Sequence, residues 1–245
     1  MVPVDWVYDE MRQIGVDFEN PEQVAQYDSK QGSDRDAERQ LVERLSIVAG
    51  QVVVDLGCGT GSFAREAARA GARVRAIDVS RTMRETLRDA AAREGLSDLQ
   101  VEHAGFLSFE ASPNSLDVVV SRFALHHLPD FWKQVALLRL HDAIRPGGCL
   151  YLRDVVFSFE SNGCEASVET WIRRMPELSG FSRQEFETHV REEYSTFAWI
   201  LEGLLERAGF EICGREYPMP EYAEYLCTPM KAASDRPGVA DEVSR

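Results

Sequence analysis

Hydrophobic positions from residue 51 onward follow two alternating periods. Short runs rich in β-branched residues predict buried strands, and between them apolar residues recur at the spacing typical of helices. The predicted strands are Val52–Asp55, Arg73–Ile77, Leu99–His103, Val118–Val120 and Cys149–Asp154. Strands that alternate with helices in this way indicate a parallel sheet whose crossover helices cover its faces.

Signals for helix ends support this pattern. The alanine-rich segment Phe63–Ala70 predicts a helix that ends before Gly71, where a residue of left-handed conformation commonly terminates a helix. Ser80 can cap the next helix, which is expected to end at Gly95. The first half of the sheet is therefore predicted to repeat a strand and a helix.

The second half adds a crossover helix and a closing pair of strands. Phe131–Ile144 is amphipathic at helical spacing, and Thr196–Ala208 predicts a further helix. Phe210–Tyr217 and Tyr222–Thr228 resemble an antiparallel pair. We expect an α/β fold with a Rossmann-like, doubly wound, seven-stranded and mostly parallel sheet and with helical lid elements.

Segments outside this repeat predict the domain organisation. In the N-terminal segment, helices are expected at Trp6–Ile14, Pro21–Tyr27 and Arg35–Val48. The expected organisation is an N-terminal helical segment contributing to a lid (1–50), a core (51–156), a helical insertion over the substrate (157–195), the C-terminal part of the core (196–230) and a disordered polar tail (231–245).

The first predicted strand runs directly into Gly57-Cys58-Gly59-Thr60-Gly61. Ligands of doubly wound sheets bind outside the carboxyl ends of the strands, where this turn lies. Glycines let the backbone adopt left-handed angles and approach a ligand closely, and the following helix directs unpaired N–H groups at the site. The turn predicts a cofactor site, and a tight strand-to-helix connection without a ligand is the alternative.

Asp78 ends the second predicted strand and places a carboxylate where the ribose hydroxyls of a nucleoside cofactor would lie. A carboxylate at a helix start is the alternative role. A nicotinamide-dependent oxidoreductase also uses an acid here, but its turn is G-x-G-x-x-G. Counted from Gly57, the third glycine position holds Ser62, which argues against that class.

Five motifs occur in a characteristic order: V-D-L-G-C-G-T-G at 54–61, A-I-D-V-S at 76–80, S-L-D-V-V-V-S at 115–121, A-L-H-H-L-P-D at 124–130 and R-P-G-G at 145–148. Together they resemble the class I methyltransferases that depend on S-adenosylmethionine (SAM), over roughly residues 20–155. The similarity is greatest to the branch that methylates quinones and other small molecules, in which a Tyr-Asp segment precedes the core. Here that segment is Tyr27-Asp28.

The resemblance implies S-adenosyl-L-methionine as the cofactor and suggests which residues contact it. The methionine part would be held by the turn Gly57, Cys58, Gly59 and Gly61, by Asp55 at its amino group, by Ser121 beneath it and by Tyr27 over it. Asp78 would accept the ribose hydroxyls, and Val79 and Met83 would flank adenine. For Val79 and Met83 ordinary helix-to-sheet packing is the alternative, and for Tyr27 a surface position.

One motif departs from the family pattern. The usual G-D-A after the third strand is replaced by His103-Ala104-Gly105-Phe106, without the acid that commonly contacts the adenine amine. We expect a backbone contact at Gly105 or stacking on Phe106 to replace it. A core position is the alternative for Phe106.

Methyl transfer is an in-line displacement, so the enzyme mainly aligns the nucleophile with a methyl group that the cofactor has already activated. A nucleophile that carries a proton still needs a base, whereas an enolic carbon does not. His126 or His127 is the candidate base, and Asp154 can orient a histidine or the substrate. Hydrogen bonding within the loop and helix capping are the alternatives.

The composition of the chain argues against several classes of partner and site. A formal charge of −14 opposes binding to nucleic acid, and five cysteines without a C-x-x-C pair suggest neither disulfides nor a metal site. No stretch of about 18 apolar residues predicts a membrane span, and the N-terminus lacks a basic leader. We expect a cytoplasmic protein.

Aromatic residues gather in the elaborations around the core, namely Trp6, Tyr8, Phe18, Phe157, Trp171, Phe181 and Trp199. They suggest a pocket for a small hydrophobic or aromatic molecule, or alternatively the internal core of the covering. His189, Glu193 and Tyr194 share a helical spacing and are expected to face this pocket or solvent. The predicted function is methyl transfer, and another SAM-dependent transfer or non-catalytic SAM binding is the alternative.

Overall fold

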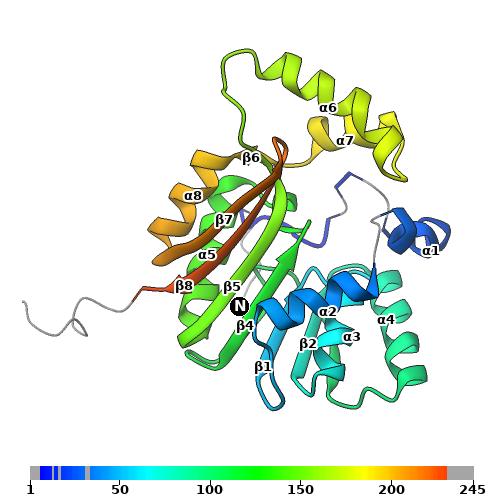
Figure 1. The fold of residues 1–245 in the computed structure, drawn as a ribbon, viewed down its shortest axis with the longest axis vertical. Coiled ribbons are helices and arrows are strands. Elements are labelled where there is room, and N and C mark those ends of the chain that lie inside the picture. The colour runs from blue at the N-terminus through cyan, green and yellow to red at the C-terminus, as the bar shows by residue number, and fades with distance from the viewer. Residues whose placement is uncertain (1–5, 13, 16–17, 31–33, 231–245) are drawn as a thin grey trace, which may run out of the picture.

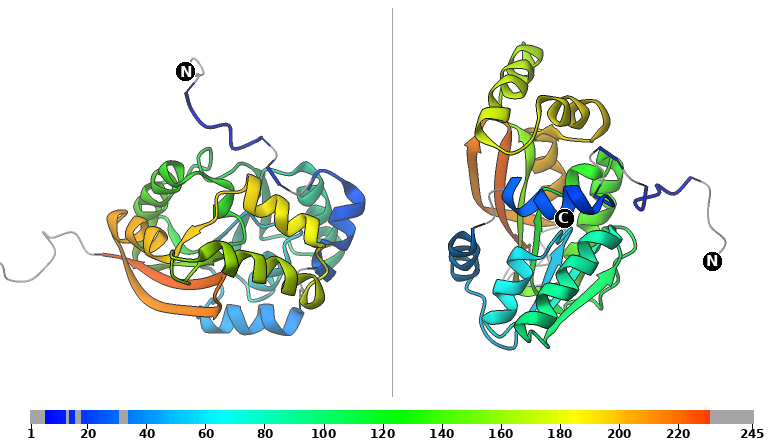
Figure 2. Two further views of the ribbon diagram at one scale, coloured as in Figure 1. Left: turned by 90° about the horizontal axis from the view of Figure 1, so that it is seen from above. Right: turned by 90° about the vertical axis from the view of Figure 1, so that its right-hand side faces the viewer.

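The computed structural model describes residues 6–12, 14–15, 18–30 and 34–230. A central sheet carries helices on both faces, and a helical pair lies above the carboxyl ends of its strands (Figures 1 and 2). The segment 231–245, for which the sequence predicts a disordered tail, lies outside the described residues. Within the described ranges, every helix is too short or too polar to cross a lipid bilayer.

The sheet contains the predicted strands in a doubly wound order. The strands are β1 Val52–Leu56, β2 Arg73–Asp78, β3 Leu99–His103, β4 Leu116–Arg122, β5 Ile144–Phe157, β6 Thr196–Phe197, β7 Phe210–Met219 and β8 Tyr222–Pro229. Their order is β3-β2-β1-β4-β5-β8-β7, and the short β6 pairs with β5 in addition. The strands from β3 to β5 are parallel, and β8 and β7 close the sheet as an antiparallel pair.

Strand order reverses between β1 and β4, which is where such sheets bind ligands. The helices are α1 Pro21–Lys30, α2 Arg35–Arg44, α3 Ser62–Arg69, α4 Arg81–Glu94, α5 Asp130–Ala143, α6 Cys164–Leu178, α7 Arg183–Glu192 and α8 Ala198–Arg207, with a short 3-10 turn at Leu125–His127. Ser80 caps α4 and Gly95 ends it in the left-handed conformation, as the sequence predicts.

The sheet separates two hydrophobic cores. One lies against α5 and α8, where Leu137 and Leu205 are buried, and the other lies against α2, α3 and α4, where Phe63 and Leu87 are buried. Because both faces of the central strands are covered, those strands are apolar almost throughout, as in Val52-Val53-Val54.

The helices α6 and α7 form the predicted insertion and have a small core of their own. Trp171, Met175 and Phe186 pack there against Val155 near the end of β5. Ser182 and Glu185 form a capping box that begins α7. We call residues 157–195 the lid, since they lie over the carboxyl edge of the sheet (Figure 1).

Three sequence predictions about elements are wrong or incomplete. Residues 6–12 and 14 form turns, bends and irregular backbone, not the helix predicted for Trp6–Ile14. Contacts with the core hold this segment, since the Glu10 carboxylate accepts the N–H groups of Leu107 and Ser108. The predicted helix Thr196–Ala208 begins two residues later, because its first residues pair with β5, and β5 extends to Phe157.

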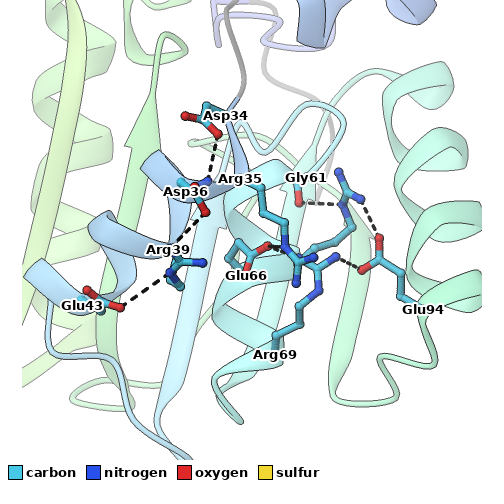
Figure 3. Close-up of polar contacts among 10 residues, drawn as sticks. Asp34, Arg35, Asp36, Arg39, Glu43, Gly61, Glu66, Arg69 and Glu94 are labelled. Atoms are coloured by element: carbon cyan, nitrogen blue, oxygen red, sulfur yellow. Dashed lines mark hydrogen bonds and ion pairs between the residues drawn. The ribbon is translucent and has the colours of Figure 1, made fainter.

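An ionic network behind the glycine turn ties α2 to α3 and α4 (Figure 3). Buried Glu66 pairs with Arg35 across 2.7 Å and also with Arg69. Glu94 pairs with Arg69 and, at 2.7 Å, with Arg65. Arg65 in turn donates to the carbonyl of Gly61 at 3.3 Å, so the network reaches the turn itself.

Glu66→Gln should lower the free energy of unfolding by about 1–3 kcal/mol, because two arginines lose a charged acceptor at a buried position. Urea denaturation measures the change. Glu43→Gln is the matched control, since Glu43 is exposed and pairs with Arg39 at only 3.9 Å (Figure 3). The control should change stability by less than about 0.5 kcal/mol. Equal effects of the two substitutions would contradict the stabilising role of the buried Glu66 ion pairs.

Candidate active site

Two cavities meet at the carboxyl ends of β1 and β4. The smaller cavity has a volume of about 150 Å³ and the larger about 590 Å³. Their shared wall is formed by Phe18, Tyr27, Gly57, Phe123 and His127. The two cavities therefore adjoin at these residues.

The smaller cavity collects the residues expected at the nucleoside end of the cofactor. It is lined by Gly59, Asp78, Val79, Met83, Gly105 and Phe106, among others. Phe106 also belongs to the hydrophobic core, which is the alternative considered for it. Asp55 and Cys58 line the larger cavity beside Gly57, and burial raises the pKa of the Cys58 thiol well above its usual value.

The glycine turn is held in place by hydrogen bonds to β2. The N–H groups of Gly57 and Cys58 both donate to the carbonyl of Ile77, at 2.8 and 3.0 Å. Gly57 has a φ of 75°, and a Cβ there would lie 2.3 Å from the Cβ of Ala124. Both N–H groups are therefore already hydrogen-bonded within the fold. A ligand that approaches the turn closely would meet its carbonyl groups.

Gly61 has a different role from the other glycines of the turn. It caps α3 with a φ of 75°, and a Cβ there would lie 2.2 Å from Leu87. Gly61 does not line either cavity, and neither does Ser121. The buried Ser121 hydroxyl has no hydrogen-bond partner among the described residues. The structure therefore places both residues behind the cavity walls.

Asp78 joins the turn to the start of α4. Its Oδ2 accepts the N–H of Gly59 and its Oδ1 accepts the N–H of Ser80, each at 2.8 Å. Burial raises the pKa of Asp78, and these two donors oppose the rise. The carboxylate thus serves the helix start and also lines the cavity where a ribose would lie.

Asp55 is a buried carboxyl group that the fold leaves poorly compensated. Burial raises the pKa of Asp55 to about 7, although the nearby Arg122 guanidinium opposes the rise. Arg122 itself is paired with Glu38 across 3.0 Å. The sequence analysis missed this pair, because no local pattern relates a residue of α2 to the end of β4.

His126 lies between two carboxylates. Its Nδ1 pairs with Asp154, and its Nε2 lies 3.1 Å from Glu193 of the lid. Burial disfavours the imidazolium, but the two carboxylates outweigh burial and raise the pKa of His126 to about 10. Asp154 also accepts the backbone N–H of His126 at 3.0 Å and does not line either cavity, so it positions the histidine.

His127 has the opposite electrostatic environment. Burial, together with the neighbouring His126 charge, lowers the pKa of His127 to about 4. The ring is therefore neutral at pH 7 and keeps a lone pair. Its backbone carbonyl accepts the Tyr8 hydroxyl at 3.0 Å, and the residue lines both cavities.

Among the described residues, His126, His127 and Glu193 place possible metal-ligand atoms within 4.8 Å of one another. Both ring nitrogens of His126 already face carboxylates. An imidazolium has no free lone pair for a cation, so we interpret this group as an ion-paired cluster.

The lid contributes polar residues to the larger cavity. His189 and Glu193 line it, and they also pair with each other. Tyr194 is partly exposed and donates its N–H to the carbonyl of His126 at 2.8 Å. The sequence analysis missed Lys133, which is fully buried and donates to the carbonyl of Tyr194, so it anchors the lid to α5.

Phe123 is a further residue that the sequence did not single out. It follows β4 with a φ of 53° and lines both cavities. Its ring meets Tyr222 edge-on, and the Arg153 guanidinium lies 5.2 Å from its centroid. A left-handed phenylalanine has no clear signal in the sequence.

Comparisons with known proteins agree with this arrangement. A model of the methyltransferase domain matches residues 53–148. An uncharacterized methyltransferase of Bacillus mycoides is 31% identical over 160 residues, which cover 65% of this chain and 69% of the relative.

Solved structures share the fold at low sequence identity. A SAM-dependent methyltransferase from Aquifex aeolicus has a TM-score of 0.62 and 16% identity, covering 85% of this chain and 97% of that one. Phosphoethanolamine N-methyltransferase 2 of Haemonchus contortus, in complex with SAM, has a TM-score of 0.66 and 17% identity, covering 88% of this chain and 60% of that one.

The pKa of Asp55 predicts a pH-dependent stability. Its folded-state pKa of about 7 lies above the ordinary 3.8, so ionised Asp55 destabilises the fold increasingly as pH rises between these values. Asp55→Asn should therefore gain about 1–4 kcal/mol relative to wild type between pH 4 and pH 8. Urea denaturation at both pH values measures the gain. The exposed control Asp98→Asn should show no such gain in the free energy of unfolding. If the free-energy difference between Asp55→Asn and wild type did not change with pH, the prediction would be contradicted.

Proposed function

The chain belongs to the class I SAM-dependent methyltransferases, and we propose that it methylates a small, largely apolar molecule held under the lid. The observation that carries this proposal is the junction of the two cavities at Gly57 and His127. One cavity has the residues expected around the nucleoside, and the other has the size and lining of a substrate pocket.

The residues present fit the cofactor. Gly57 lines both cavities, and the buried Asp55 carboxyl group lacks a full counter-charge, which the cofactor's ammonium would supply. We assign Asp78 to the ribose hydroxyls and Tyr27 to the methionine end. The bound cofactor supplies a methyl group on a sulfonium, which is the electrophile of the reaction.

The lining of the larger cavity supports an apolar acceptor. Its apolar wall comes from the lid and from neighbouring strands and includes Phe123, Val155, Trp171, Met175, Phe181, Phe186, Met219 and Tyr222. Of the aromatic residues singled out in the sequence, Phe18, Trp171 and Phe181 line this cavity, whereas Trp6 and Trp199 are largely exposed. The net charge of −14 and the covering lid disfavour a nucleic acid as the substrate.

The two histidines divide their roles in this proposal. His127 is neutral and lies at the junction, so it can accept a proton from an oxygen or nitrogen nucleophile. His126 is already protonated between Asp154 and Glu193, so it holds the loop and the lid in place. In-line transfer then depends on holding nucleophile and methyl group about 3–3.5 Å apart.

Asp78→Ala should weaken binding of S-adenosylhomocysteine by about 2–3 kcal/mol, because a charged acceptor of hydrogen bonds is removed. Isothermal titration calorimetry measures the loss. Asp78→Asn keeps an oxygen that can accept the Gly59 N–H. It therefore distinguishes the loss of a ligand contact from loosening of the turn. Exposed Asp89→Ala on α4 is the control. Unchanged affinity in both Asp78 variants would remove this residue from the cofactor site.

Conversion of SAM to S-adenosylhomocysteine should occur with at least one member of a panel of phenols, quinones, carboxylates and amines. With a protonated nucleophile, His127→Ala should lower kcat by about 10²–10⁴-fold without weakening cofactor binding. His141→Ala, outside both cavities, is the control.

Two results would count against the proposal. Full turnover of His127→Ala would show that the enzyme works by positioning alone, without His127 as a base. Tight binding of NAD with no response to SAM or S-adenosylhomocysteine would overturn the function itself.

A further inference from the structure

We call the N-terminal residues 6–12, 14–15 and 18–20 the strap. The strap residues that line the smaller cavity are Glu10, Met11, Arg12, Ile14, Phe18 and Glu19. The core holds the strap at several points. The Ser80 hydroxyl donates to the carbonyl of Phe18 at 2.8 Å, and the N–H of Arg81 donates to Glu19 at 2.7 Å. At its other end, the Tyr8 hydroxyl donates to the carbonyl of His127.

Glu10 fixes the strap to the segment that follows β3. Its Oε2 and Oε1 accept the N–H groups of Leu107 and Ser108, each at 2.7 Å. A Cβ at Gly105 would lie 2.4 Å from Oε2 of Glu10. The Glu10 carboxylate thus occupies the space that a side chain at position 105 would fill.

The acid expected after β3 is missing from the stretch His103-Ala104-Gly105-Phe106. The sequence has Gly105 there, and the structure brings in a carboxylate from a residue 95 positions earlier in the chain, as 105 − 10 gives. Glu10 lines the smaller cavity together with Val79, Met83 and Phe106. These are the residues assigned above to the adenine end.

We propose that Glu10 accepts a hydrogen bond from the exocyclic amino group of adenine and thereby selects a 6-aminopurine cofactor. This inference rests on the proposed function, in that the smaller cavity holds the nucleoside of the cofactor. A carboxylate has about four lone-pair sites, so it can serve two backbone donors and still accept an amine. A 6-oxopurine would instead turn a carbonyl oxygen toward the carboxylate, where both groups are acceptors.

The experiment compares S-adenosylhomocysteine with S-inosylhomocysteine, which carries an oxygen in place of the amino group. Calorimetric titration of the wild-type protein should show a clear preference for the adenosyl compound. Glu10→Ala should weaken binding of the adenosyl compound by roughly 10–100-fold and affect the inosyl compound much less, so the preference falls. Glu10→Gln should also lower the preference, because its amide can donate to the oxygen.

Asp9→Ala is the matched control within the strap. Asp9 accepts the N–H of Met11 at 3.1 Å and does not line the smaller cavity, so its removal loosens the same turn and removes the same charge. This variant should keep the wild-type preference. The double variant Glu10→Ala/Gly105→Asp should recover the preference for the adenosyl compound that Glu10→Ala loses. The reason is that removal of Glu10 frees the space for a carboxylate at position 105.

The outcomes separate the inference from the proposed function. A preference that is unchanged in both Glu10 variants would overturn the role of Glu10. An equal loss of affinity for both compounds would also overturn it, because that result indicates a purely structural role for the strap contact. Failure of the wild-type protein to bind S-adenosylhomocysteine would overturn the cofactor site itself, and this inference with it.

Discussion

A buried carboxylate must find donors or a counter-charge, and this constraint organises the carboxyl edge of the sheet. Asp78 satisfies it with the backbone N–H groups of Gly59 and Ser80, and Asp154 with His126. Glu193 satisfies it with His126 and His189, which hold the pKa of Glu193 well below its ordinary value although burial opposes them. Each solution joins two segments that are distant in sequence, so the same bonds that satisfy the charges also build the site.

Asp55 is the buried carboxyl group that does not obtain such compensation. The neighbouring cation Arg122 is shared with Glu38, and the pKa of Asp55 stays near 7. A site for a cationic ligand needs an acid that the fold has left without a full partner. Under the proposed function, this position has a cost in stability, which is a common feature of binding sites.

The neighbouring histidines show how one loop can carry two protonation states. His126 and His127 are adjacent, with ring centroids 4.4 Å apart. Carboxylates from β5 and from the lid keep the first charged, and that charge helps to keep the second neutral. The strap and the lid also meet over this site, since a Cβ at Gly15 would lie 1.8 Å from Oε1 of Glu193. The strap contacts His127 and the lid contacts His126, so both segments border the same pair of histidines.

The sequence alone determined the features that depend on local pattern. Strand and helix periods, the glycine turn, the Ser80 cap and Asp78 at a strand end all follow from short segments and from the rule that parallel strands end at one edge. Only the tertiary structure decided which distant groups meet. Residues 6–12 and 14 do not form the expected helix, and Glu10 accepts the N–H groups of Leu107 and Ser108. Glu38 likewise meets Arg122 across 84 residues of chain. Such pairs leave no periodic trace, because the burial and charge compensation that select them exist only after the sheet has formed.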